Sequence, residues 1–263
     1  IGASPTSKNC LIVGNRGTAP AGATIYCEQS NSVFDNCTLA DNDAGENGAA
    51  LYSVSSNLTM TNSILWGNLP EQILVESGND PMIVYTDVQG GWPGVGNTNS
   101  APLFARPGYW VDPHDPELRP TGPDTLDAIW RQGDYHLLSR TGRYDPHSMA
   151  WILDEFTSPC IDAGDPDSRW AGESKPNGAH INMGGYGGTD QASYSPRVMP
   201  IVAHWPFDES SGTSAYDAVG DKHGTVHGAV RTEGILDGAL KFDGLDDYVD
   251  CGNDTALAPD LFT

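Results

Sequence analysis

The chain of 263 residues is poor in positive charge and in long apolar segments, and each shortage excludes a class of protein. It carries 13 Lys and Arg against 35 Asp and Glu, a formal net charge of −22. Nucleic acid and anionic membrane surfaces are bound by clustered Lys and Arg, so neither is expected as a partner. No apolar run reaches the roughly 18 residues of a membrane span, so no insertion into a bilayer is expected.

Cysteine and helix-forming patterns are also scarce. Five scattered cysteines do not make a disulfide framework, and no Cys-x-x-Cys or paired-histidine spacing indicates zinc. No long segment has the apolar period of a helix, whereas the chain has 31 Gly, 19 Pro and only 18% charged residues. This composition is typical of an all-β protein with long loops.

What the sequence does contain is a repeat. The phrase NCLIVGN at residues 9–15 returns as NCTLADN at 36–42 and NSILWGN at 62–68, and a degraded copy, TDVQGG, occupies 86–91. A second phrase, GATIYC, returns in phase as GAALYS. A fixed step of 26 or 27 residues predicts a solenoid, in which each unit buries its apolar face against its neighbours.

The units predict which solenoid. Three short apolar or Thr-rich runs fit into one period, separated by Asn, Gly, Ser and Asp, so we expect three strands per coil and a right-handed parallel β-helix. Inward side chains then stack about 4.8 Å apart in neighbouring coils. The expected ladders are Ile12, Leu39, Leu65 and Val88, and Ile25 over Leu51.

Two polar positions repeat with the coils. Asn9, Asn36 and Asn62 fit an internal asparagine ladder, because the Asn side chain tolerates the left-handed backbone region and bonds turn backbones above and below it. The alternative is that these residues mark surface turns. Cys10 and Cys37 also share one repeat position, and we interpret them as stacked small side chains rather than as a disulfide.

The repeat stops near Gly91, and four later phrases carry a resemblance. APLFARPGYW (101–110), GDYHLLSRTGRYDP (133–146), SPCIDAGDP (158–166) and INMGGYGGTDQAS (181–193) resemble the C-terminal segment of secreted bacterial right-handed β-helix proteins of the pectate-lyase-like kind. With the repeats, the resemblance covers residues 1–196. It implies that this segment covers the last coil as a plug, with glycines 184, 185, 187 and 188 in tight turns. The candidate plug residues are Leu103, Phe104, Tyr135, Leu137, Ile161 and Met183.

A second resemblance begins at residue 201. The phrases WPFDE, SGT and ALKFDGLDDYV are similar to the opening strands of a laminin-G-like (concanavalin-like) jelly roll. The resemblance implies calcium near the ligand edge, with Asp208 and Asp243 as metal ligands, although a turn role for each stays open. Four aromatic residues here could line either a sugar platform or the core: Trp205, Phe207, Phe242 and Tyr248. We expect the core, because Trp205 and Phe207 are two residues apart and face the same side of a strand.

The expected organisation is β-helix coils at 1–92, an irregular capping segment at 93–196, a linker at 197–200 and the beginning of a jelly roll at 201–263. We expect an internal fragment of a longer chain, in which the jelly-roll piece is poorly packed or borrows the flank of the β-helix, and holds no complete glycan site.

Carboxylates crowd the capping segment, where they either hold calcium or form turns. Oxygen-rich loops bind calcium, but Asp next to Pro is an ordinary turn former, and no EF-hand spacing is present. The residues are Asp112, Asp115, Asp124, Asp127, Asp145, Asp154, Asp162, Asp165 and Asp167.

No catalytic constellation is evident. Polysaccharide lyases need calcium-binding aspartates with an Arg or Lys base, and glycoside hydrolases need paired carboxylates. The coils offer only Arg16, with Lys8 just before them, and a turn role is expected for Asp35, Asp41 and Asp43. His136 alternates with apolar neighbours and is expected to be packed, and neither Ser139 nor Ser158 lies in a G-x-S-x-G motif.

Two function classes follow. We favour a non-catalytic protein, extracellular or on the cell surface, whose β-helix is a stalk for an adhesion module that binds an extracellular polysaccharide or a cell-surface protein. The alternative is a fragment of a polysaccharide lyase or glycoside hydrolase whose catalytic coils lie upstream. Fold alone does not separate them.

Overall fold

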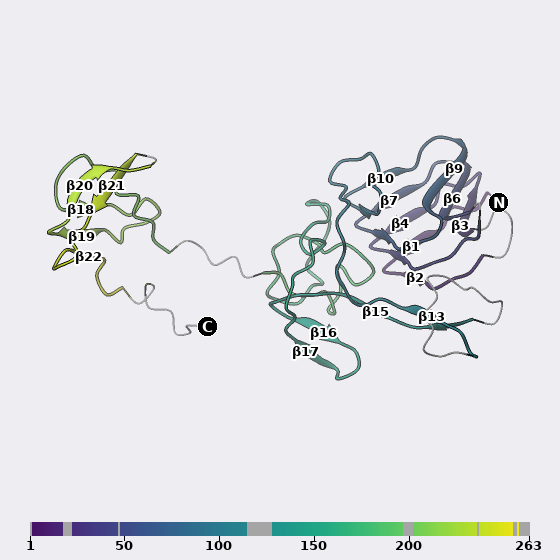
Figure 1. Cartoon of the computed structure of the whole chain (residues 1–263). Coiled ribbons are helices and arrows are strands. Elements are labelled where there is room, and N and C mark those ends of the chain that lie inside the picture. Colours follow the sequence, from purple (N-terminus) through teal and green to yellow (C-terminus); the bar gives the residue numbers. More distant parts are fainter. Residues whose placement is uncertain are drawn as a thin grey trace. The chain divides into compact units, whose positions relative to one another are not determined.

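The computed structural model describes residues 2–17, 23–46, 48–114, 128–196, 202–235, 237–254 and 257. The chain divides into two compact units, residues 1–197 and 198–263, which are described separately below. The described residues form strands and loops without an α-helix, as the sequence predicts (Figure 1). None of the described segments is a helix long and apolar enough to cross a membrane. The expected linker at 197–200 lies outside the described residues.

The first unit begins with three parallel sheets, and each coil contributes one strand to each sheet (Figure 1). The first sheet contains β1 (Thr6–Lys8), β4 (Val33–Asp35), β7 (Thr59–Thr61) and β10 (Met82–Val84). The second sheet contains β2 (Leu11–Val13), β5 (Thr38–Ala40), β8 (Ile64–Trp66) and β11 (Asp87–Val88). The third sheet contains β3 (Ala23–Glu28), β6 (Ala49–Ser56) and β9 (Glu71–Gly78).

The predicted apolar ladders are confirmed. Leu39 pairs with Ile12 on one side and Leu65 on the other, and Val88 follows Leu65. Leu51 pairs with Ile25, and a third row joins Phe34, Met60 and Ile83. These three rows form one buried cluster, so the coil interior is the core of this unit.

Turns at two positions of the repeated phrase keep the coils in register. The first residue has a positive φ in all three copies, 51° at Asn9, 48° at Asn36 and 54° at Asn62. The sixth residue does so too, as Gly14, Asp41 and Gly67. Gly, Asn and Asp are the residues that enter the left-handed region most readily, so the phrase encodes both bends between strands.

The described part of the capping segment contains three antiparallel strand pairs and long loops. Its strand pairs are β12 (Phe104–Arg106) with β15 (Asp134–Leu137), β13 (Tyr109–Val111) with β14 (Ile129–Arg131), and β16 (Arg143–Asp145) with β17 (Ala150–Ile152).

Where this segment packs differs from the expectation. Five of the six candidate plug residues, all but Leu103, form a cluster with Ala40 and Ile64 on the outer face of the second sheet. They therefore cover the side of the coils and not their open end, and the plug expectation is wrong for them. At the open end, Trp92 packs against the interior cluster, and Thr98 bridges to Asp87 in the last coil.

Glycines allow this close approach. A Cβ at Gly185 would lie 2.5 Å from Leu11 Cδ2, and one at Gly184 would lie 2.9 Å from Ile64 Cδ1. Residues from elsewhere in the chain cover the apolar outer face of the second sheet. At positions 184 and 185 only glycine, which has no Cβ, lets the backbone of the capping segment come this close to the sheet.

The second unit is small and antiparallel. One sheet joins β18 (Ser214–Ala215), β19 (Gly224–His227) and β22 (Tyr248–Asp250), and β20 (Val230–Glu233) pairs with β21 (Gly238–Lys241). Of its apolar side chains, Ala215 and Val226 are the buried ones among the described residues. The core expectation is wrong for Phe242 and Tyr248, whose exposed fractions are 47% and 53%, whereas Trp205 and Phe207 are partly buried.

Candidate functional site

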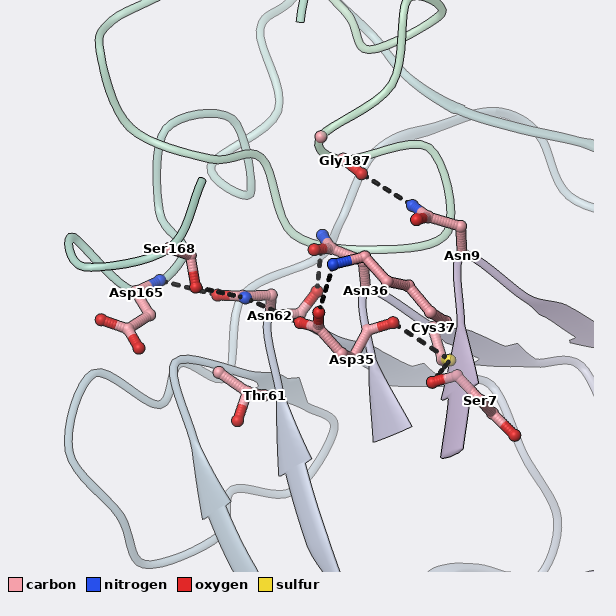
Figure 2. Close-up of polar contacts among 12 residues, drawn as sticks. Ser7, Asn9, Asp35, Asn36, Cys37, Thr61, Asn62, Asp165, Ser168 and Gly187 are labelled. Carbon is pink, nitrogen blue, oxygen red and sulfur yellow. Dashed lines mark hydrogen bonds and ion pairs between the residues drawn. The ribbon is translucent and has the colours of Figure 1, made fainter. Parts of the chain in front are cut away.

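The asparagine that begins each repeated phrase binds the capping segment (Figure 2). Asn9 Nδ2 donates to the Gly187 carbonyl at 2.7 Å, and Asn36 Nδ2 donates to the Asn182 carbonyl at 2.8 Å. Asn62 Oδ1 accepts the backbone N–H of Asp165 at 2.7 Å. Since Asn36 and Asn62 are completely buried, these amides are not surface turn markers. Asn36 Nδ2 also lies 3.3 Å from the Asn62 carbonyl of the next coil, so the expected contact to a neighbouring turn backbone is present at this position. Asn9, Asn36 and Asn62 therefore form a row that binds a distant part of the chain, and we call this row the asparagine docking line.

The internal asparagine ladder lies instead at the last residue of the same phrase. Asn15 Nδ2 donates to Asn42 Oδ1 at 2.8 Å, and Asn42 Nδ2 donates to Asn68 Oδ1 at 2.8 Å. The signal was present in the sequence, because each of the three full copies of the phrase begins and ends with Asn. The expectation named the first position, where Asn36 contacts the turn backbone of Asn62, and missed the side-chain ladder at the last position.

The cysteines at the repeat position are free thiols. Cys37 Sγ donates to the Ser7 carbonyl at 3.5 Å, and Cys10 Sγ donates to the Lys8 carbonyl at 3.3 Å. Burial raises the pKa of the Cys37 thiol to about 11, which makes it a poor nucleophile at neutral pH. The interpretation as stacked small side chains agrees with this geometry.

A buried charge cluster occupies the capping segment. Arg143 Nη1 lies 3.1 Å from Asp134 and its Nε lies 3.0 Å from Asp154, with all three side chains about nine-tenths buried. His136 Nδ1 contacts Asp134 at 2.6 Å, and its ring stacks on Tyr186 with centroids 3.6 Å apart. His136 is packed, as expected, and the cluster joins β15 to the β16–β17 hairpin.

A cavity of about 190 Å³ borders this cluster. Arg106, Asp134, Arg143, Asp145 and His147 line it. Asp145 accepts the Ser148 hydroxyl at 2.6 Å, which lowers the pKa of that carboxyl. The carboxylates here already bind Arg143 or their own turn.

The two serines have structural partners. Ser139 Oγ donates to the Tyr194 carbonyl at 2.6 Å, and Ser158 Oγ donates to the Pro102 carbonyl at 2.6 Å. Because both hydroxyls donate to backbone carbonyls and not to a histidine or carboxylate of the described residues, neither is arranged as an activated nucleophile.

The aspartates of the coils are also engaged. Asp35 lies 2.7 Å from Lys8, and Asp43 accepts the N–H of Gly45 and bridges to Arg16 through the backbone. Asp41 accepts the Tyr135 hydroxyl at 2.7 Å, and burial raises the pKa of the Asp41 carboxyl. These contacts fit the turn roles that the sequence predicts and add a tie to the capping segment.

Other carboxylates of the capping segment support turns. Asp112 accepts the N–H of His114, Asp165 accepts that of Asp167, and Asp162 accepts the Ser195 hydroxyl at 2.7 Å. Asp115, Asp124 and Asp127 lie outside the described residues. Within the described part of the capping segment, no group of three carboxylates converges as a metal site would require.

One buried carboxyl was not predicted. Glu173 is 5% exposed, and its Oε1 accepts the N–H groups of Asn182 and Gly188, each at 2.8 Å. Burial raises its pKa to about 7, and the charge of Asp162 adds to that shift. The surrounding ESKPNG stretch reads as an ordinary loop, so local sequence held no signal for this burial.

The second unit separates the two metal candidates. Asp243 lies with Asp246 and Asp247, and their ligand oxygens fall within 4.8 Å of one another. Three carboxylates suit the hard oxygen ligation of calcium. Asp208 does not belong to this group; it accepts the Gly238 N–H at 3.0 Å, at the other end of β21.

Aromatic and polar side chains share the open face of the β18–β19–β22 sheet. His227 and Tyr248 are register partners, and their rings stack with centroids 4.5 Å apart. In the neighbouring row, Thr225 pairs with Asp250. All four side chains are exposed, so the face presents a flat ring surface beside hydroxyl and carboxylate groups.

Comparison with known proteins supports the coil architecture. The family model described as the right handed beta helix region matches residues 2–88, the stretch that contains β1 to β11. The comparison with curated proteins gives no match. The search of solved structures gives none either.

Proposed function

We propose that this chain is a non-catalytic binding protein of the cell exterior or cell surface, in which the β-helix is a stiff stalk and the second unit binds an extracellular polysaccharide or a cell-surface protein. The observation that carries the proposal is the open face of the β18–β19–β22 sheet, with its stacked His227 and Tyr248. Aromatic rings offer a large rigid contact surface, and the adjacent hydroxyl and carboxylate can bond the hydroxyls of a sugar.

The state of the polar groups in the first unit supports a structural role for it. The candidate catalytic side chains bind backbone, each other or the capping segment; they are Asp35, Asp41, His136, Ser139 and Ser158. The capping segment also packs on the outer face of the second sheet. A rigid solenoid that presents a separate unit is the simplest use of this arrangement.

Binding and turnover by the whole chain distinguish the proposal from the enzyme alternative. The open face changes the expectation from sequence that residues 201–263 hold no complete glycan site. We now expect retention on a glycan array of neutral and acidic polysaccharides, loss of that retention in Tyr248→Ala, and retention by the control Phe242→Ala, which removes an exposed ring beyond β21. We expect no cleavage of pectate, alginate or chondroitin with or without calcium. Turnover that disappears on substituting Arg16 or His136 would overturn the non-catalytic assignment.

A further inference from the structure

The strand β9 ends the third sheet with one edge open. The first and second sheets have four strands, but the third has three, in the order β3, β6, β9 (Figure 1). β9 pairs with β6 alone among the described strands. Residues 95–98 bond the last strands of the other two sheets, through Tyr85 N–H to the Val95 carbonyl and Val88 N–H to the Thr98 carbonyl. No equivalent pairing is described for β9.

An open edge of this length has a defined chemistry. β9 spans eight residues, Glu71–Gly78, and alternate N–H and C=O groups of a terminal strand point away from its neighbour. Such a row pairs readily with another extended chain, and its main-chain hydrogen bonds supply affinity without requiring a pocket. β9 also contains no proline that would remove a donor.

The side chains of β9 indicate what fits beside it. Ile73 follows Leu51 on the interior side, and it packs with Trp92 against the edge of the core cluster, where both are only partly buried. Glu71, two residues before Ile73, shares the face of Ile73, whereas Glu76 is exposed on the outer face and accepts the Tyr52 hydroxyl at 2.6 Å. An added strand would therefore place apolar side chains over Ile73 and Trp92 and cationic ones beside Glu76.

We propose that β9 is a docking edge for an extended segment of a partner protein, in which apolar and basic residues alternate, and which adds to the third sheet as a fourth strand. A second copy of this chain suits the edge poorly, because each copy carries a net charge of −22 and its own β9 is acidic. The inference is independent of the glycan face on the second unit.

The test uses the whole chain and a synthetic seven-residue peptide of alternating valine and lysine with blocked ends. We expect saturable binding by fluorescence anisotropy and slower amide exchange in residues 71–78 when the peptide is present. Two further peptides are N-methylated at alternate residues, one in each of the two possible registers. The peptide whose methyl groups replace the N–H donors that face β9 should bind about tenfold more weakly or worse. Glu76→Lys should weaken binding several-fold, whereas Glu155→Lys, which makes the same charge change at an exposed site elsewhere, should not.

Three results would overturn the proposal. The first is no saturation at millimolar peptide. The second is equal binding of both N-methylated registers, or equal effects of the two charge reversals, because both indicate attraction to net charge alone. The third is a concentration-dependent dimer in sedimentation that protects residues 71–78, which would make the occupant a second copy.

Discussion

Replacing Glu173 with Gln should change how the stability of the first unit depends on pH. Glu173 lies in a buried loop, where one carboxylate oxygen accepts two backbone N–H groups and the other, Oε2, has no partner. Its pKa rises from 4.5 to about 7, mainly because burial penalises the charged form. Because the folded-state pKa is the higher one, the folded state retains the proton more strongly than the unfolded chain.

The sign and size follow from linkage. Stability from protonated Glu173 is fully present below about pH 4.5 and is lost as pH rises through about 7. A shift of 2.5 units (7 − 4.5) at 1.36 kcal/mol each corresponds to about 3 kcal/mol of unfolding free energy. Gln keeps the shape and the accepting oxygen but does not titrate. The unfolding free energy of Glu173→Gln minus that of the parent protein should therefore increase by about 3 kcal/mol between about pH 4 and pH 8.

Urea unfolding of both proteins across that range measures this difference. Glu155→Gln is the control, because it removes an exposed carboxylate from the same segment and should leave the slope unchanged. Parallel stability curves for the parent and Glu173→Gln would refute the reasoning, since they would mean that Glu173 is as well solvated in the folded protein as in the unfolded chain.

Further substitutions test the other features. Leu39→Ala should cost about 2–5 kcal/mol of unfolding free energy by leaving a cavity, and Leu39→Asp should prevent folding by burying an unpaired charge; both are measured by circular dichroism and urea titration. Asn42→Ala should cost about 1–3 kcal/mol because it removes the donor to the Ile12 carbonyl and the acceptor of the Asn15 N–H, whereas Asn57→Ala, in an exposed Asn pair, should cost less. Calcium should raise the melting temperature of the second unit in the parent protein and not in Asp243→Asn; the same rise in both would contradict a site at Asp243.

The coils could be predicted from sequence because their information is local and repeated. Leu39 and Leu65 occupy equivalent positions in two copies of one phrase, so a single period places both in the interior and fixes their register. The strand-to-strand spacing then determines the ladder. No comparable period exists beyond Gly91, where the contacts of each residue depend on segments far away in the chain.

The same reasoning does not predict how the capping segment packs on the coils. Nothing local distinguishes Asn36, which binds Asn182 across 146 residues, from Asn42, which binds the next coil. Both are buried Asn residues of the same phrase. Likewise, the apolar residues Phe104 and Met183 were recognisable as buried, but whether they cover the end or the side of the coils depends on a long-range arrangement.

The asparagine docking line also limits how this protein can change its length in evolution. Most solenoids grow or shrink by duplicating or deleting a repeat, since each unit contacts only its neighbours. Here Asn9, Asn36 and Asn62 are matched one by one to partners in the capping segment. A duplicated coil inserted between them would present a bare apolar flank and an unmatched amide, so coil number and capping segment must be inherited together.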